Sequence, residues 1–286
     1  MAGSYIVAGA RTPIGKMSGA LAGFSAADLG GFAIKAALER AGVKPEEVEH
    51  VIMGQVLMAG QGQVPSRQAA SKAGIPMNVP SVNINKVCLS GLNSIYLADQ
   101  MIQSGEADIV VAGGMESMTN APYLAMGARG GFRYGHTELS DAIIKDGLWC
   151  AFDACLMGLG TERYAAGGIS REQQDDAAMK SNQRAAAAIA SGKLAEEIVE
   201  VGVPQRKGDP VMVKNDEGVR ADTTMDSLGG LKPAFDKEGT ITAANASFSS
   251  NRSMSETFMF ARSSARRMER AGWCSNDALS GPATMP

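Results

Sequence analysis

The sequence has few of the residues that build metal and redox sites. Its 286 residues include two histidines and four cysteines, and no two cysteines form a Cys-x-x-Cys pair. Structural metal sites usually combine several cysteine and histidine ligands, so we expect no metal site. Few cysteines, none of them in a Cys-x-x-Cys pair, also indicate a reducing compartment, which we take to be the cytoplasm.

Long apolar runs and a large excess of charge of one sign are lacking too. No apolar run reaches the roughly 18 residues of a membrane-spanning helix, and no charged segment followed by an apolar one marks a secretory signal. The 27 basic and 30 acidic residues give a net charge of −3. We therefore expect neither a membrane nor a nucleic acid as partner. The chain is 45% hydrophobic, enough for a sizeable core.

One cysteine, Cys88, has a distinctive position. Apolar residues end a strand pattern at residues 82–87 and then recur at helical spacing, so a strand passes directly into a helix. Cys88 is expected in the first turn of that helix, where unpaired N–H groups and the helix dipole favour a thiolate. This predicts a nucleophile, and a buried, unreactive cysteine is the alternative. The apolar stripe of the helix comprises Leu89, Leu92, Tyr96, Ala98, Met101 and Ile102.

The first 120 residues alternate between strand and helix patterns. Strands are predicted over residues 4–8, 48–53, 82–87 and 107–112, and helices over residues 28–41, 66–73 and 88–104. This order predicts an α/β fold with helices packed over a mixed sheet. Asp28 is the expected N-cap of the first helix and Gly42 its end. Gly113-Gly114 ends the last strand, where backbone could approach a ligand closely.

Residues 121–247 have weaker strand patterns and more glycine, methionine and charge. Ser170 is the expected N-cap of a long helix that ends near Gly192, because Gln173 stands at the capping-box position. Residues 198–203 alternate and predict a strand.

Several sequence blocks resemble one enzyme family, in that family's order. They are Ala10-Arg-Thr-Pro-Ile-Gly15, Asn85-Lys-Val-Cys-Leu-Ser-Gly-Leu-Asn-Ser94, Ala112-Gly-Gly-Met-Glu-Ser-Met118 and Lys232-Pro-Ala-Phe-Asp-Lys-Glu-Gly-Thr-Ile-Thr242. The block around Cys88 resembles the active-site segment of the thiolases, the acetyl-CoA acetyltransferases and 3-ketoacyl-CoA thiolases. The likeness covers residues 5–247.

The resemblance implies a thiolase-like α/β fold, a mixed sheet with helices on both faces and an inserted α+β loop domain. Residues 1–120 then form the N-terminal core half, and residues 121–247 form the loop domain and the return to the core. Residues 248–286 form a tail without family likeness, and the second half is largely missing, which we interpret as a frameshift, a deletion or an altered terminus. Ala244 replaces a usual glycine and would be strained at positive φ.

The resemblance also implies an activity, acetyl-CoA C-acetyltransferase. Two acetyl-CoA would give acetoacetyl-CoA and CoA, reversibly, through an acyl-Cys88 intermediate, with coenzyme A thioesters as substrates and no cofactor. The family further implies a homo-oligomer, a dimer or tetramer, in fatty acid metabolism. Positions that match the family's coenzyme A and acyl contacts are Met157, Arg220, Ser227, Ala234, Phe235, Ala243 and Ser247.

The acid/base residues of the family are absent from this sequence. They belong to Gly-His-Pro, Cys-x-Gly-Gly-Gly and Asn-Glu-Ala-Phe motifs, none of which occurs here. His136 and Cys274 have unrelated neighbours, His50 is expected to be a half-exposed strand residue, and Cys150 and Cys155 are interpreted as structural. Because loss of one member of a cooperating set costs orders of magnitude in rate, we expect this chain to be impaired in the full reaction.

Three alternatives stay open. The chain could be a degradative 3-ketoacyl-CoA thiolase. Leu156, which stands where biosynthetic thiolases often have histidine, leaves the preferred acyl chain length open. The chain could be a non-catalytic fragment that binds coenzyme A or oligomerises. It could also be a condensing enzyme related to the ketosynthases, although no basic patch for an acidic carrier protein is evident.

Overall fold

A five-stranded mixed sheet forms the centre of the protein. The computed structural model describes residues 3–246 and 253–262. The strands are β1 (Ser4–Arg11), β2 (His50–Gly54), β3 (Ser81–Ile84), β4 (Ile109–Ser117) and β11 (Ser253–Arg262). Their order is β1-β11-β4-β2-β3, with β2 parallel to both β3 and β4, and β11 antiparallel to both of its neighbours. The expected mixed sheet is confirmed.

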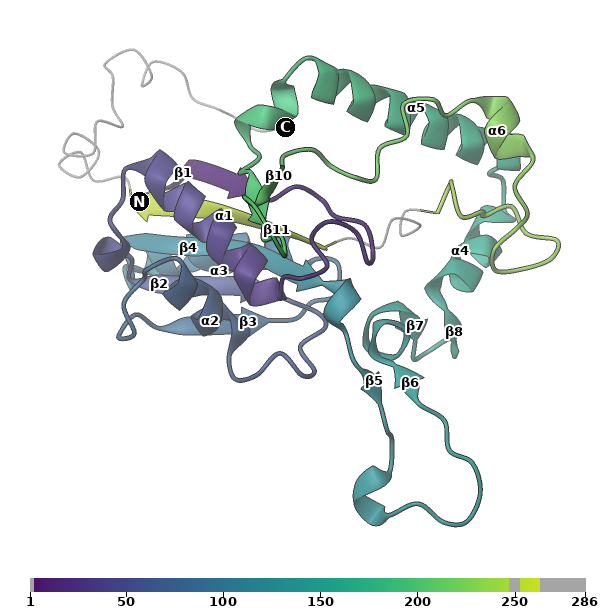
Figure 1. Cartoon of the computed structure of the whole chain (residues 1–286), viewed down its shortest axis with the longest axis horizontal. Coiled ribbons are helices and arrows are strands. Elements are labelled where there is room, and N and C mark those ends of the chain that lie inside the picture. The colour runs from purple at the N-terminus through teal and green to yellow at the C-terminus, as the bar shows by residue number, and fades with distance from the viewer. Residues whose placement is uncertain (1–2, 247–252, 263–286) are drawn as a thin grey trace.

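Helices cover both faces of the sheet because the central strands are apolar on both sides. Val51 and Val111 point to the face covered by α1 (Ala26–Ala41) and α2 (Pro65–Lys72), which share one buried cluster with them. The intervening residues Ile52 and Val110 point to the other face, where α3 (Ser90–Ser104) lies. This alternation follows from the two-residue period of a strand. Figure 1 shows α1 running across the sheet.

The boundaries of α1 differ slightly from expectation. Ser25 is the N-cap, and Asp28 occupies the third helical position of a capping box in which each side chain receives the other's backbone N–H. A salt bridge from Lys72 on α2 also reaches Asp28 at 2.7 Å. Burial alone would raise the pKa of Asp28, but hydrogen bonds from Lys72 and Ser25 outweigh it and lower that pKa. The helix ends at Gly42 in the left-handed conformation, as expected.

Strand β11 was not predicted from the sequence. It lies between β1 and β4, so residues 253–262 complete the middle of the sheet. From the sequence, this segment belongs to a tail without family likeness, because its residues do not match the family pattern. Position in the sheet depends on backbone hydrogen bonds more than on that pattern.

Residues 118–246 form a second region of short elements. Its helices are α4 (Met157–Ala165), α5 (Arg171–Ala190) and α6 (Met225–Gly229). Its hairpins pair β5 (Tyr123–Leu124) with β6 (Ser140–Asp141), β7 (Trp149–Cys150) with β8 (Cys155–Leu156), and β9 (Val201–Val203) with β10 (Val211–Val213). Short 3-10 or π turns occur at Pro45–Glu47, Met118–Asn120, Ala128–Gly130, Ile143–Leu148 and Lys193–Glu196.

The long helix α5 begins as the sequence predicts. Ser170 and Gln173 form the expected capping box. In Figure 1, α5 and α6 lie beyond one end of the sheet, and the β5–β6 hairpin projects away from it. No helix within residues 3–246 and 253–262 is long and apolar enough to cross a membrane.

Candidate active site

Cys88 lies in a tight elbow between β3 and α3, and its side chain is exposed. The elbow is closed by hydrogen bonds from two side chains to the backbone. Asn85 Oδ1 accepts from the backbone N–H of Val87 at 2.9 Å, and Ser90 Oγ accepts from the backbone N–H of Lys86 at 2.8 Å. Val87 has a φ of 50°, which is unusual for a β-branched residue. The elbow thus presents Cys88 to solvent on a constrained backbone.

The helix begins later than expected, at Ser90, so Cys88 precedes it by two residues. The Ser90 hydroxyl also donates to the carbonyl oxygen of Val87 at 2.6 Å, and the Ser90 N–H donates to the same oxygen at 3.1 Å. These bonds form a turn ahead of the helix, which explains the later start. Cys88 is still next to the helix N-terminus, where backbone N–H groups lack partners within the helix.

The first turns of α3 lie directly on the sheet because small residues meet there. A Cβ added to Gly54 would lie 2.5 Å from the carbonyl carbon of Ser90 and 2.7 Å from the nitrogen of Gly91. A Cβ added to Gly114 would lie 3.4 Å from the Cα of Gly91. Gly54 therefore allows the helix to approach the sheet, whereas a Cβ at Gly114, where a ligand was expected, would only be in ordinary van der Waals contact with Gly91.

This close approach also changes which face of α3 is buried. Ser94 is fully buried, and its hydroxyl donates to the carbonyl oxygens of Gly91 and Gly113 at 2.6 and 2.8 Å. Leu92 and Tyr96, expected to pack inward, are 62% and 58% exposed. That part of the predicted stripe was wrong, because small residues are needed where the helix touches glycines of the sheet.

Glu116, near the end of β4, is an ionisable side chain that was not predicted as a site residue. Its carboxylate accepts from the backbone N–H of Val56 at 2.8 Å and of Leu57 at 3.3 Å. Burial raises the pKa of Glu116 to about 7, although these backbone hydrogen bonds act in the opposite direction. An acidic residue two positions after Gly113-Gly114 was the only sequence signal that pointed to Glu116.

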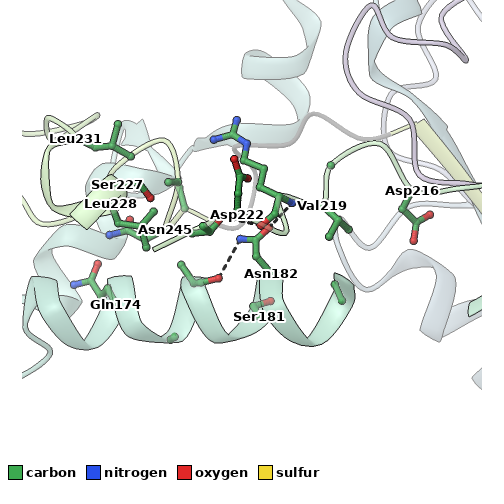
Figure 2. Close-up of a pocket in the computed structure, with 18 of the residues that line it drawn as sticks. Gln174, Ser181, Asn182, Asp216, Val219, Asp222, Ser227, Leu228, Leu231 and Asn245 are labelled. Atoms are coloured by element: carbon green, nitrogen blue, oxygen red, sulfur yellow. Dashed lines mark hydrogen bonds between the residues drawn. The ribbon is translucent and has the colours of Figure 1, made fainter. Parts of the chain in front are cut away.

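A separate cleft of about 980 Å³ lies along α5. It is bounded by that helix, by residues 216–231 and by the turn at residues 244–246. Figure 2 shows Ser227, Leu228 and Leu231 near the Gln174 end of the cleft, with Val219 and Asp216 towards its other end. Both Arg220 and Ser227, predicted to contact coenzyme A, line it.

The wall that carries Arg220 is anchored to the core through Asp216 and Glu217. Arg11, at the end of β1, binds Asp216 through two hydrogen bonds of 2.8 and 3.1 Å. Both side chains of this ion pair are more than nine-tenths buried. Burial would lower the pKa of Arg11, but its bonds to Asp216 and Glu197 raise it. Glu217 accepts from the backbone N–H of Lys16 at 2.8 Å. The sequence block that contains Arg11 therefore holds one wall of the cleft in place.

Helix α5 orients the backbone of Arg220. Asn182 Oδ1 accepts from the Arg220 N–H at 3.0 Å, and the carbonyl oxygen of Arg220 accepts from the Thr223 hydroxyl at 2.8 Å. The side chain of Arg220 is exposed in the cleft. A planar guanidinium in such a position suits a phosphate or an aromatic ring.

The other predicted binding residues that the structure describes, Met157, Ala234, Phe235 and Ala243, are not among the residues that line this cleft. Met157 begins α4, and a Cβ on the adjacent Gly158 would lie 2.3 Å from Cζ of Phe235, so these segments are in direct contact. The N–H of Ala234 donates to the carbonyl oxygen of Ile241 at 2.8 Å, and Ala243 is exposed in the turn that follows. Ser247 lies outside the described residues, and Cys88 is not among the residues that line the cleft.

Ala244 does line the cleft, and it has no positive φ. The Asn245 side chain holds this turn, accepting from the Thr242 N–H at 2.7 Å and donating to the buried carboxylate of Asp175 at 2.8 Å. The conditional expectation of strain at Ala244 is therefore not met.

The remaining histidines and cysteines form no metal site among the described residues. Burial lowers the pKa of His50, a half-buried residue in β2, and His136 is exposed in the β5–β6 hairpin. Cys150 and Cys155 are free thiols at paired positions of β7 and β8, and Cys150 Sγ donates to the Asp153 carboxylate at 3.3 Å.

An α/β core that presents a cysteine at a strand-to-helix elbow, joined to a region with a long cleft, is an arrangement suited to acyl transfer through a thiol. Residues 4–253 match the family described as thiolase, N-terminal domain. The chain belongs to the thiolase family.

Curated relatives agree with this assignment. The chain is 57% identical over 243 residues to an acetyl-CoA acetyltransferase of Cupriavidus necator and 55% identical over 243 residues to a probable acetyl-CoA acetyltransferase of Mycolicibacterium smegmatis. It is 48% identical over 243 residues to a probable acetyl-CoA acyltransferase of Staphylococcus aureus. Each match covers 85% of this chain and 62%, 63% and 62% of the respective relative. The chain thus spans less than two thirds of their length.

Proposed function

We propose that the protein is an acetyl-CoA C-acetyltransferase of the thiolase family whose Cys88 accepts an acetyl group from acetyl-CoA. The observation that supports this most directly is the position of Cys88, exposed in a constrained elbow at the start of α3. In this step the thiolate attacks the thioester carbonyl, a Cys88 S–C bond forms, and the S–C bond to coenzyme A breaks. The departing coenzyme A thiolate takes up a proton.

Coenzyme A is proposed to bind in the cleft along α5. Arg220 and Ser227 supply a cation and a hydroxyl there, and the apolar side chains Leu228 and Leu231 line the same space. Mixed polar and apolar lining of this kind suits a ligand with phosphates and a largely apolar arm. Met157, Ala234, Phe235, Ala243 and Ser247 are proposed to contact the arm and the acyl group. No cofactor or metal is proposed.

The second half of the reaction needs a base for the α-carbon of another acetyl-CoA. The family's Gly-His-Pro and Cys-x-Gly-Gly-Gly motifs are not among these 286 residues. We therefore propose that the protein of 286 residues carries out the acylation step but forms acetoacetyl-CoA poorly. A degradative 3-ketoacyl-CoA thiolase is the second candidate, and the acyltransferase name of the Staphylococcus aureus relative favours testing longer acyl groups.

We also propose that the protein self-associates, as a dimer or tetramer, in the cytoplasm and serves fatty acid metabolism. Self-association is supported by apolar side chains that are exposed on α3 and by Phe132 and Tyr134 in the β5–β6 hairpin. The cytoplasm is supported by the three described cysteines, all free thiols.

Intact-mass spectrometry after incubation with acetyl-CoA tests the acylation. We expect a gain of one acetyl group that is absent from Cys88→Ser. Incubation with hexanoyl-CoA under the same conditions compares chain lengths. A folded protein that gains no acetyl group, or gains it equally in Cys88→Ser, would show that the proposal is wrong.

A further inference from the structure

The carboxylate of Glu116 connects strand β4 to the segment that follows the neighbouring strand β2. Glu116 belongs to β4, whereas Val56 and Leu57 follow β2. Its two oxygens accept from the backbone N–H groups of both residues, at 2.8 and 3.3 Å. A side chain from the neighbouring strand therefore helps to fix the segment after β2, beside the bond within that segment from Gln55 Nε2 to the carbonyl oxygen of Leu57 at 3.3 Å.

This segment in turn contacts the elbow of Cys88. The carbonyl oxygen of Val56 accepts from Asn85 Nδ2 at 3.4 Å. The other end of the same amide, Oδ1, accepts from the N–H of Val87 at 2.9 Å. Three hydrogen-bonded steps thus connect the partly buried carboxylate of Glu116 to the residue directly before Cys88.

The elbow has a physical need for such a connection. Val87 is held at a φ of 50°, a conformation that costs a β-branched residue free energy and that an unrestrained turn would leave. Asn85 restrains the Val87 N–H, yet its own side chain is exposed and would be free to rotate without a second contact. The Val56 carbonyl supplies that contact, and Glu116 holds Val56.

We propose that Glu116 is a positioning residue for Cys88, acting through Val56 and Asn85 to hold the elbow in the geometry that acylation requires. The proposal rests on the proposed acyl transfer for its chemistry, but its geometric content concerns the reactivity of the Cys88 thiol towards any electrophile. Glu116 touches neither the thiol nor the cleft along α5 in the described structure.

The test measures two rates on Cys88 by mass spectrometry, acetylation by acetyl-CoA and alkylation by iodoacetamide. The variants are Glu116→Ala, Asn85→Ala, the double variant and the isosteric Glu116→Gln. Glu49→Ala is the matched control. Glu49 accepts from the backbone N–H of Asp108 and thereby also connects the segments of β2 and β4, but at their opposite ends.

Both single alanine variants are expected to slow the two reactions by about tenfold, because small displacements of a reacting group reduce rates strongly. The double variant should be no slower than the slower single variant, since both changes break one connection. Glu116→Gln should recover most of the rate, because the glutamine carbonyl still accepts from Val56. The half-saturating concentration of acetyl-CoA should stay unchanged, and Glu49→Ala should match the wild type.

Several results would overturn the inference. They are wild-type rates in Asn85→Ala, losses that multiply in the double variant, or an equal loss in Glu49→Ala. If Glu116→Ala does not fold, Asn85→Ala and Glu116→Gln still decide the question, because Asn85 is exposed and glutamine preserves the shape of Glu116. Failure of acetylation in the wild type, with the expected pattern in alkylation, would contradict the proposed function and leave this inference standing.

Discussion

At the scale of single residues, the backbone of Val87 stores strain beside the nucleophile. A non-glycine residue at φ 50° costs on the order of 1–3 kcal/mol. In Val87→Gly this cost disappears, while the greater entropy of glycine in the unfolded chain lowers the free energy of unfolding by about 0.5–1 kcal/mol. We expect urea unfolding to show equal or higher stability, and mass spectrometry to show slower acetylation of Cys88 because the elbow is looser. A clear loss of stability would mean that Val87 is not strained.

The ionisation of Glu116 gives a pH dependence of stability. Its pKa is about 7 in the folded protein, against an ordinary value of 4.5. The folded protein therefore binds more protons than the unfolded chain between these values, so the free energy of unfolding falls as pH rises through that range. The full effect is on the order of 3 kcal/mol. Glu116→Gln lacks this group, so the wild type should lose stability relative to it between pH 4.5 and 8 in urea titrations. Parallel curves would contradict the assignment.

At the scale of elements, the contact of α3 with the sheet depends on Gly54. In Gly54→Ala the new methyl group would meet the backbone of Ser90 and Gly91, which cannot yield as a side chain would. We expect a loss of about 2 kcal/mol or more in unfolding free energy, with slower acetylation of Cys88. Gly91→Ala is the matched control, because its nearest heavy atom would be 3.9 Å away. Equal effects of the two variants would argue against this packing.

The ion pair of Arg11 and Asp216 connects β1 to the cleft wall. In Arg11→Ala the buried carboxylate of Asp216 would lose its partner, which typically costs about 3–5 kcal/mol. We expect a fall in urea stability and weaker binding of coenzyme A by calorimetry. Lys180→Ala breaks an exposed pair with Asp176 on α5 and should cost about 0.5 kcal/mol or less. Similar costs for both variants would show that the buried pair has no special role.

Local patterns predicted the elements well, and contacts between distant segments less well. The capping box at Ser170 and the end of α1 at Gly42 depend only on neighbouring residues, so the sequence sufficed. Cys88 was placed in the helix because no pattern shows that Asn85 and Ser90 would capture the preceding N–H groups. The bond between Arg11 and Asp216 joins residues far apart in sequence, and only the fold reveals it.

At the scale of the whole molecule, the outer face of α3 predicts association. Leu92 and Tyr96 are exposed there among the described residues, and β3 is an edge strand with one unpaired side. Size-exclusion chromatography should show a species larger than a monomer, and Leu92→Gln with Tyr96→Gln should shift it to a smaller one. Met77→Gln, at another exposed methionine, is the control. A well-behaved wild-type monomer would contradict this prediction.

The candidate site was predictable only in part at this scale. The resemblance of ordered sequence blocks led to the elbow of Cys88. It also led to Arg220 and Ser227, and these two residues line one cleft. It did not lead to Glu116, whose importance comes from a hydrogen bond to a segment 60 positions earlier. Nor did it lead to β11, since pairing with β1 and β4 is a property of the assembled sheet.

The position of β11 has a consequence for how the chain folds during synthesis. Ser4 pairs with Arg262, so β1, made first, waits for a partner that is made much later. Until then β1 and β4 have no strand between them, and the N-terminal segment has no place in the sheet. Closing so long a loop is slow and exposes strand edges meanwhile. We expect nascent chains shorter than about 250 residues to be sensitive to protease and to bind chaperones, with compaction delayed until β11 has left the ribosome.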